Sequence, residues 1–217
     1  MLAKSRMQEL FLGLSQSEIL AEVRAQKESG ATNEEIIRDL HGGIMAVDDA
    51  FGEGRMFVAD LVVSAEIFRL AVDIIMPDSE SGILTPIKSK GKVVIGTAKD
   101  DLHDIGKGVT SSLLRAAGYE VIDIGVDASP SDFVDAARKS GARIMAISCL
   151  LTTCMPSIIS TIEELKRTGL SSRVKTIVGG APLSAKFAGY CGADAYGPHA
   201  RDAVIFADSV YAKGQAV

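Results

Sequence analysis

The sequence has no tryptophan and only three cysteines and three histidines among 217 residues, and aromatic side chains make up 5%. The cysteines, Cys149, Cys154 and Cys191, are odd in number and contain no C-x-x-C pair, so they indicate neither a disulfide framework nor a structural zinc site. We expect reduced thiols, as in cytoplasmic proteins.

Two further absences narrow the class of protein. No apolar run approaches the roughly 20 residues that span a bilayer, and the first residues are too weakly apolar for a secretory signal. Lysine and arginine total 23 against 28 acidic residues, a formal net charge of −5, so no basic stripe is available for a phosphate backbone. We expect a cytoplasmic protein whose partners are neither nucleic acids nor membranes.

The composition that is present, 47% apolar and 24% charged, is typical of a globular protein with one large or two small domains. The charge is unevenly divided. Residues 1–85 carry 7 basic and 15 acidic side chains, a net charge of −8, whereas residues 86–217 carry 16 and 13, a net charge of +3. We predict two domains, 1–85 and 86–217, with Pro77–Gly91 as the linker.

The first region has only helical patterns. The capping-box pattern Ser15-Gln-Ser-Glu18 predicts a helix to about Ser29, and Thr32-Asn-Glu-Glu35 predicts a longer one. The segment Met56–Met76 is apolar nearly all round and is predicted to be a buried central helix, so we expect a small helical bundle. The predicted buried face of the second helix consists of Ile37, Leu40, Ile44, Val47 and Phe51.

The second region alternates between strand and helix patterns, which predicts an α/β domain with a five-stranded parallel sheet in the flavodoxin-like (Rossmann-like) order 2-1-3-4-5. The predicted helices cover about 105–117, 130–140, 155–168 and 182–189, with a last one from about 199. The predicted strands are Lys92–Ala98, Tyr119–Gly125, Arg143–Cys149, Val174–Gly179 and Ala193–Tyr196.

In this strand order, ligands bind at the carboxyl ends of strands 1 and 3, which directs attention to the loop after Ala98. That loop places His103 among three carboxylates, Asp100, Asp101 and Asp104. Its simplest interpretation is a solvated turn with a helix-capping aspartate, but its position at the mouth of the sheet favours a functional one.

Several functional interpretations of the loop fail on the sequence. A P-loop would need glycine at Asp101 and serine or threonine at Gly108, and no G-x-G-x-x-G fingerprint follows the first strand. A phospho-acceptor receiver would need an aspartate where the third strand ends in Ser148, and a lysine after the fifth. A free metal ion needs three or four ligands, whereas a metal held by a macrocycle needs one axial ligand such as His103, oriented by a carboxylate such as Asp101.

Three motifs then occur in order, each at the carboxyl end of a predicted strand. Asp101-x-His103-x-x-Gly106, Ser148-x-Leu150 and Gly179-Gly180 resemble the D-x-H-x-x-G, S-x-L and G-G signature of cobalamin-binding domains. The helical region, with Phe51-Gly-Glu-Gly54 before its apolar helix, is similar to the cap of the methyltransferase corrinoid proteins of methanol, methylamine and aryl methyl ether systems. The resemblance spans almost the whole chain.

The resemblance implies a cobalamin or related corrinoid as cofactor, in its methylated, Co(II) and Co(I) states, with His103 as the lower axial ligand of cobalt and Asp101 paired to its other nitrogen. Gly106, Gly179 and Gly180 would line a slot for the displaced nucleotide tail, and Tyr196 would either close the slot or lie in the core. Ser148 and Thr152 would hydrogen-bond the buried base, with Leu150 as an apolar wall.

This sequence departs from the related domains at one position. Where a hydroxyl can extend the histidine–aspartate pair, it has Cys154, a weak donor, so a complete relay is not assigned. Cys149 and Cys154 are interpreted as small apolar fillers. His41 and His199 are interpreted as surface or helix-end histidines.

The function implied is that of a methyl carrier rather than of an enzyme with its own substrate pocket. Its partners would be a substrate:corrinoid methyltransferase, a methyltransferase acting on tetrahydrofolate or a thiol, and a reductive activator. A cobalamin sensor or photoreceptor and the small subunit of a cobalamin mutase are the alternatives. Aryl methyl ethers, methylamines, methanol and betaines all stay open as donors, with a slight preference for O-demethylation.

Overall fold

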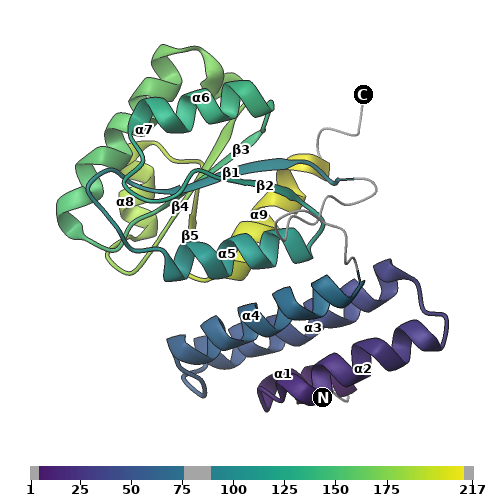
Figure 1. The fold of residues 1–217 in the computed structure, drawn as a ribbon. Coiled ribbons are helices and arrows are strands. Elements are labelled where there is room, and N and C mark those ends of the chain that lie inside the picture. Colours follow the sequence, from purple (N-terminus) through teal and green to yellow (C-terminus); the bar gives the residue numbers. More distant parts are fainter. Residues whose placement is uncertain (1–4, 76–88, 213–217) are drawn as a thin grey trace. The chain divides into compact units, whose positions relative to one another are not determined.

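The computed structural model describes residues 5–75 and 89–212. The chain divides into two compact units. One is built from the N-terminal helices, and the other is a five-stranded sheet with helices on both faces (Figure 1). The predicted combination of a helical region and an α/β region is therefore confirmed. Residues 77–88 of the predicted linker lie outside the described residues.

The helical unit starts with a helix that was not predicted. Its four described helices are α1 (Arg6–Leu12), α2 (Gln16–Glu28), α3 (Asn33–Gly52) and α4 (Val58–Ile75). The first is too short for its periodicity to stand out from the sequence. Helices α1 and α2 both pack against a longer helix, α1 on α3 and α2 on α4, and α3 packs on α4.

The capping boxes differ from the prediction at one of two places. At α3 the prediction is confirmed, because Glu35 N donates to Thr32 Oγ1 (3.3 Å) and Thr32 N donates to the Glu35 carboxylate (2.9 Å). Ser15 makes no such cap: the turn after α1 holds its backbone at φ −80°, ψ 73°, outside the extended region of a capping residue. The other capping box in this unit joins Ser5 and Gln8 at the start of α1.

The core of the helical unit uses only part of each predicted apolar face. On α3, Leu40, Ile44 and Val47 are fully buried as predicted, whereas Ile37 and Phe51 are half-buried. On α4 the prediction of burial all round was wrong, because Val62 and Val63 are 42% and 43% exposed. Neighbouring helices cover the opposite stripe of α4, which carries Leu61, Ser64, Ile67, Phe68, Ala71, Val72 and Ile75.

The sheet confirms the predicted topology. All four strand pairs are parallel, and the order is β2-β1-β3-β4-β5. The strands are slightly shorter than predicted, except that the last ends one residue later: β1 (Lys92–Thr97), β2 (Glu120–Asp123), β3 (Ile144–Ser148), β4 (Lys175–Gly179) and β5 (Ala195–Gly197).

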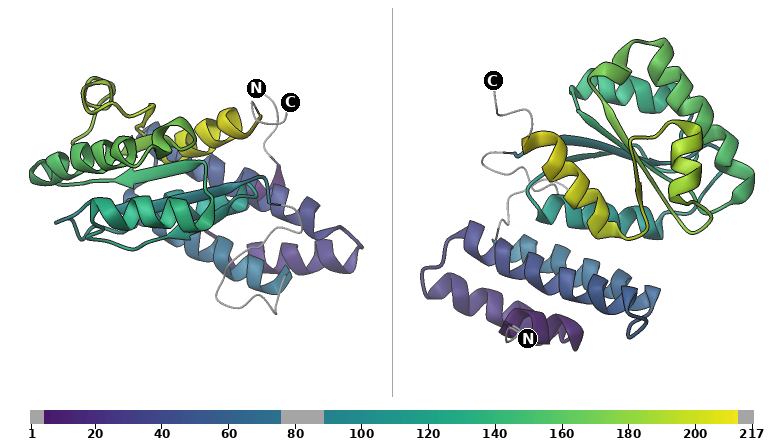
Figure 2. Two further views of the ribbon diagram at one scale, coloured as in Figure 1. Left: turned by 90° about the horizontal axis from the view of Figure 1, so that it is seen from above. Right: turned by 180° about the vertical axis from the view of Figure 1, so that it is seen from behind.

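Helices cover both faces of the sheet, as Figures 1 and 2 show. One layer contains α5 (Ile105–Ala116) and α9 (Ala200–Ala212), and the other contains α6 (Pro130–Ser140), α7 (Met155–Arg167) and α8 (Ala185–Cys191). Short 3-10 turns at Thr152–Cys154 and Leu170–Ser172 flank α7. Helix α8 begins later than the predicted residue 182 because Ser184 caps it, accepting from Phe187 N (3.2 Å).

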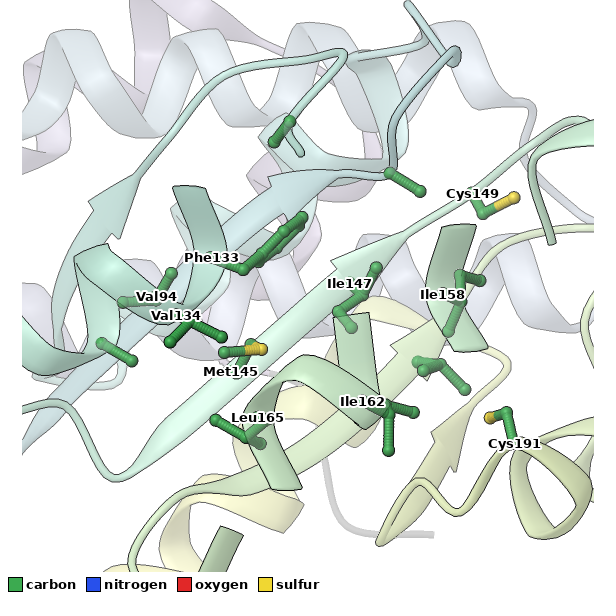
Figure 3. Packing of buried hydrophobic residues seen from close by; sticks show 14 of the residues in the cluster. Val94, Phe133, Val134, Met145, Ile147, Cys149, Ile158, Ile162, Leu165 and Cys191 are labelled. Atoms are coloured by element: carbon green, nitrogen blue, oxygen red, sulfur yellow. The ribbon is translucent and has the colours of Figure 1, made fainter. Parts of the chain in front are cut away.

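The main core of the α/β unit lies between the sheet and the α6–α7–α8 layer (Figure 3). Apolar side chains of β1 and β3, such as Val94 and Ile147, meet Phe133 of α6 and Ile158 of α7 there. Parallel strands covered by helices are buried on both faces, which explains their continuous apolar runs. This packing holds the carboxyl ends of the central strands in place.

Among residues 5–75 and 89–212, no helix combines the length and the hydropathy that are needed to cross a membrane.

Candidate cofactor site

The register of the sheet brings the three sequence motifs to one edge. Thr97, the last residue of β1, is paired with Ser148, which is paired with Gly179, which in turn is paired with Gly197. These four residues form one row across the sheet, next to the loops that follow each strand. The loop carrying His103 therefore leaves the sheet beside the Ser148 and Gly179 loops.

His103 and Asp101 form a close pair at this edge. Asp101 Oδ1 lies 2.6 Å from His103 Nδ1 and also accepts from His103 N (3.1 Å). Asp101 Oδ2 accepts from the backbone N–H groups of Leu150 (2.6 Å) and Leu151 (3.2 Å) in the loop after β3. The Ser148-x-Leu150 motif is thus tied to the histidine through the backbone of Leu150.

The environment of Asp101 determines which nitrogen of His103 faces outward. Asp101 is fully buried, while the His103 side chain is 51% exposed. Burial alone would raise the pKa of Asp101, but the Leu150 N–H, the His103 ring and the other backbone donors outweigh it, so the pKa lies below its usual value. The carboxylate is therefore ionised at neutral pH, and Nδ1 of His103 carries the donated proton. Nε2 is then the ring nitrogen left for a metal.

Three further residues, missed in the sequence, support the backbone of this loop. Thr97 Oγ1 donates to His103 O (2.8 Å), Ser157 Oγ of α7 accepts from Lys99 N (3.1 Å), and Asp127 Oδ1 accepts from Asp100 N (2.8 Å). A partial signal was available, because Asp127 follows β2 and so belongs to the same edge of the sheet. Ser157 lies inside a helix and carried no signal.

Large apolar side chains in the loops that carry the His103–Asp101 pair are exposed rather than packed against the rest of the protein. Leu102 is 72% exposed and Ile105 is 53% exposed, on either side of His103 along the chain. Leu150 and Leu151, whose N–H groups bind Asp101, are also exposed. Exposed apolar residues gathered at one loop cluster are typical of a ligand surface. The Leu150 side chain thus fits the predicted apolar wall.

The motif glycines fall into two groups, those that close packing requires and those beside which space is left open. Gly180 has φ +129°, and a Cβ there would lie 1.9 Å from Cys149 O. Only glycine therefore fits at this position, where the loop after β4 passes close to the end of β3. At Gly179 a Cβ would lie 2.9 Å from Gly197 O of β5. Gly106 and Gly108 are different, because a Cβ at either would meet nothing within 4 Å, although glycine destabilises a helix. Their open space is what a ligand resting on α5 requires.

The first turn of α5 is anchored between these two glycines. Lys107 is buried, and its Nζ lies 2.6 Å from Asp123 Oδ2 at the end of β2. This ion pair holds the first turn of α5 against the end of β2. The predicted base-binding residues lie near the same edge: Ser148 is half-buried at the end of β3, and Thr152 is exposed in the turn that follows.

The cysteines belong to the core rather than to the histidine–aspartate pair. Cys149 and Cys154 are both buried in the hydrophobic cluster behind the loop. Burial, followed by the nearby Asp101 carboxylate, raises the pKa of Cys149 to about 11, so its thiol is neutral. Cys154 is not among the donors to Asp101, and Tyr196 also packs on this cluster.

The remaining two histidines belong to other segments of the chain. The prediction of a surface or helix-end position was wrong for His41, which is half-buried in the middle of α3 with its Nε2 buried, and it is confirmed for His199, which directly precedes α9. Within residues 5–75 and 89–212, no three side chains of histidine, cysteine, aspartate or glutamate gather to hold a metal. The donor set at the site is one imidazole with a carboxylate behind it, which suits a metal whose other positions are filled by a macrocycle.

The residues present therefore fit a corrinoid: one oriented imidazole, an exposed apolar rim and an open glycine surface on α5. A flavodoxin-like sheet carrying these features at its carboxyl edge defines a cobalamin-binding protein.

Comparison with known proteins gives the same class. A B12 binding domain family matches residues 91–205, and a second B12 binding domain family matches residues 16–76. A corrinoid protein of Desulfitobacterium hafniense is 41% identical over 171 residues, 79% of either chain. Trimethylamine corrinoid protein 2 of Methanosarcina mazei is 35% identical over 189 residues, 86% of either chain.

A solved structure is similar over nearly the whole chain. It is a chain of the methanol:cobalamin methyltransferase complex of Methanosarcina barkeri, with 26% identity and a TM-score of 0.74, covering 95% of this chain and 78% of that one. The chain belongs to the B12-binding corrinoid protein family, and its cofactor is a cobalamin or related corrinoid.

Proposed function

We propose that this protein carries a methyl group on the cobalt of its corrinoid between two methyltransferases. The first would be a substrate:corrinoid methyltransferase, and the second would act on tetrahydrofolate or a thiol. When bound, the corrinoid supplies a cobalt that accepts and releases methyl groups. The observation that carries the proposal is the His103–Asp101 pair, an oriented imidazole set beside an open apolar surface.

In this proposal His103 would hold the cobalt through Nε2, and Asp101 would position the imidazole. The four hydrogen-bond contacts to Asp101 hold the carboxylate rigidly, so the imidazole is oriented before a metal arrives. A proton on Nδ1 stays beside Asp101 whether or not Nε2 is bound. Asp101 and its backbone donors would thus keep the His103 ring in the orientation that is needed to bind the metal.

In this proposal Gly106, Ser148 and Thr152 have the roles expected from the motifs, whereas the two glycines after β4 have a different one. Gly106 leaves the open surface on α5, and Ser148 and Thr152 provide hydroxyls near the carboxyl edge. Gly179 and Gly180 act indirectly, because they let the loop after β4 pass close to its neighbours. We further propose that residues 1–85 form the cap domain and residues 86–217 the cofactor domain.

The donor class is proposed from the relatives. The trimethylamine corrinoid protein and the methanol:cobalamin methyltransferase complex support small methylated amines or alcohols, delivered by a separate methyltransferase. O-demethylation stays a prediction, as does a reductive activator. A panel of donors, each assayed with its methyltransferase, would identify the partner.

The test is reconstitution with a corrinoid followed by EPR of the Co(II) form. We expect nitrogen hyperfine structure from a protein imidazole, its loss in His103→Ala, and about 10- to 100-fold weaker corrinoid binding. His199→Ala is the matched control and should keep the signal. Retention of the signal in His103→Ala would remove His103 as the ligand. Methyl transfer that proceeds without any methyltransferase would contradict the carrier role.

A further inference from the structure

The loop that carries His103 contains an unusual backbone conformation. Asp100, directly before the Asp101-x-His103 motif, has φ 68°, in the left-handed region that non-glycine residues rarely adopt. Asp127, in the loop after β2, has φ 55°. Only one other non-glycine residue with positive φ, Leu14, occurs in the described ranges 5–75 and 89–212. Two rare conformations therefore meet at this edge of the sheet.

Asp127 is bonded to the turn from both sides. Its Oδ1 accepts from Asp100 N (2.8 Å) and contacts Lys99 Nζ (2.8 Å), and its own N–H donates to Asp101 O (2.9 Å). A parallel bridge between Ala98 and Ala128 also joins the residue after β1 to the loop that carries Asp127. Three consecutive residues of the histidine loop are thus bound by one aspartate.

The backbone contacts are the important part of this arrangement. The Lys99–Asp127 ion pair is 44% and 42% exposed, and exposed ion pairs contribute little to stability. The two backbone bonds instead determine the conformation of Asp100 and the direction in which Asp101 leaves the turn. Asp101 in turn orients the His103 ring, as described above.

We propose that Asp127 is a positioning residue for the cofactor: it holds the left-handed turn at Asp100 so that the Asp101–His103 pair is already set before the corrinoid binds. This inference rests on the proposed role of His103. The hydrogen bonds of Asp127 to this loop go to the backbone of Asp100 and Asp101 and to the Lys99 side chain, so it would act on His103 through the turn rather than by direct contact.

The chain contains a matched control for this aspartate. Asp194 also contacts a lysine, Lys175 Nζ (2.8 Å), and also accepts a backbone N–H, that of Thr176 (2.8 Å). It directly precedes β5, and the two residues that it contacts begin β4, so these contacts lie at the amino edge of the sheet. Asp127→Ala and Asp194→Ala therefore remove similar contacts, but only one of them removes contacts to the histidine loop.

The first measurement uses the full-length protein without corrinoid. Hydrogen–deuterium exchange of the peptide covering 98–104 should become faster in Asp127→Ala and stay unchanged in Asp194→Ala. Asp127→Asn, which keeps an oxygen acceptor and tolerates positive φ, should restore slow exchange. Asp127→Gly keeps the backbone conformation without the acceptor and should exchange fast, which separates the two contributions if the alanine variant folds poorly.

The second measurement follows corrinoid binding. Asp127→Ala should bind up to about tenfold more weakly, the lower end of the loss expected for a direct partner of a metal ligand, because Asp127 acts one step further out; the imidazole-bound fraction in the Co(II) EPR spectrum should also fall. Glycine adopts positive φ without strain, so adding Asp100→Gly to Asp127→Ala should recover part of the lost corrinoid affinity.

The outcomes separate the two proposals. If Asp127→Ala matches Asp194→Ala in exchange of 98–104 and in corrinoid affinity, Asp127 is only a stabilising residue and the inference is wrong. If His103→Ala keeps the nitrogen signal, the ligand assignment fails. The exchange result on the corrinoid-free protein still decides whether Asp127 holds the loop.

Discussion

The two edges of the sheet differ in how their groups are used. At the amino edge, where the strands begin, side chains hydrogen-bond the backbone groups of the strands, whereas at the carboxyl edge large apolar side chains are exposed. Tyr211 of α9 accepts from Lys92 N (2.8 Å) and Arg143 N (3.2 Å) and donates to Lys92 O (2.6 Å). At the carboxyl edge, Leu102 and Ile105 are exposed beside His103. One edge thus stabilises the fold, and the other edge holds the ligand surface, as expected for parallel sheets.

The largest effect on stability is expected at a carboxyl-edge residue that the fold itself needs. Gly180→Ala would place a Cβ against Cys149 O at φ +129°, so we expect the free energy of unfolding to fall by about 3 kcal/mol or more. Urea unfolding of the corrinoid-free protein measures it. Gly189→Ala in α8, where a Cβ meets nothing within 4 Å, is the control and should be neutral or slightly stabilising. An equal effect at both positions would contradict the packing argument.

The amino edge should affect stability alone. Tyr211→Phe removes the hydroxyl that binds two backbone N–H groups and one carbonyl, and should lower the free energy of unfolding by about 1–3 kcal/mol. The corrinoid dissociation constant of the folded variant should not change. Tyr190→Phe, at a side chain that is 79% exposed, provides the control and should leave both quantities unchanged. Weaker corrinoid binding in Tyr211→Phe would remove the functional contrast between the edges.

A pH dependence should also come from the amino edge. Burial, followed by the hydrogen bond of Tyr119 OH to Asp208 (2.7 Å), raises the pKa of Tyr119 far above its usual value. The unfolded chain would lose this proton near about pH 10 while the folded chain keeps it, so the stabilisation is complete below that pH and declines above it. Tyr119→Phe should weaken the alkaline decline in urea midpoint. An unchanged slope would show that other groups cause it.

The smallest and opposite effect is expected at Gly106. Gly106→Ala should stabilise the corrinoid-free protein by about 0.5–1 kcal/mol, because alanine favours the helix and a Cβ there meets nothing within 4 Å. The same Cβ would fill the proposed cofactor surface, and overpacking of about 1–3 kcal/mol corresponds to about 5- to 150-fold weaker corrinoid binding. Thermal unfolding and a binding titration test the two signs separately. Unchanged affinity would mean that the corrinoid does not rest on this turn.

Much of the fold could be predicted because its signals are local. Alternating strand and helix patterns, with Pro130 and Ser129 opening α6, determine the βαβ order and hence the sheet. The errors occurred where the local signal was weak or misleading: α1 is only 7 residues long, and Ser15 has the sequence of a cap without its backbone conformation. The exposed stripe of α4 depends on which helices pack against it, which periodicity does not contain.

The site was predictable to the same extent. The sequence by itself determined the order of the three motifs along the chain and the pairing of Asp101 with His103, because the motifs are read directly from the residues and the pair lies only two positions apart. Only the tertiary structure decided that Leu150 acts on Asp101 through its backbone, that Asp127 and Ser157 hold the loop, and that Gly106 is open while Gly180 is closed. These contacts join residues that are dozens of positions apart, and packing of the parallel strands, rather than any local pattern, brings them together.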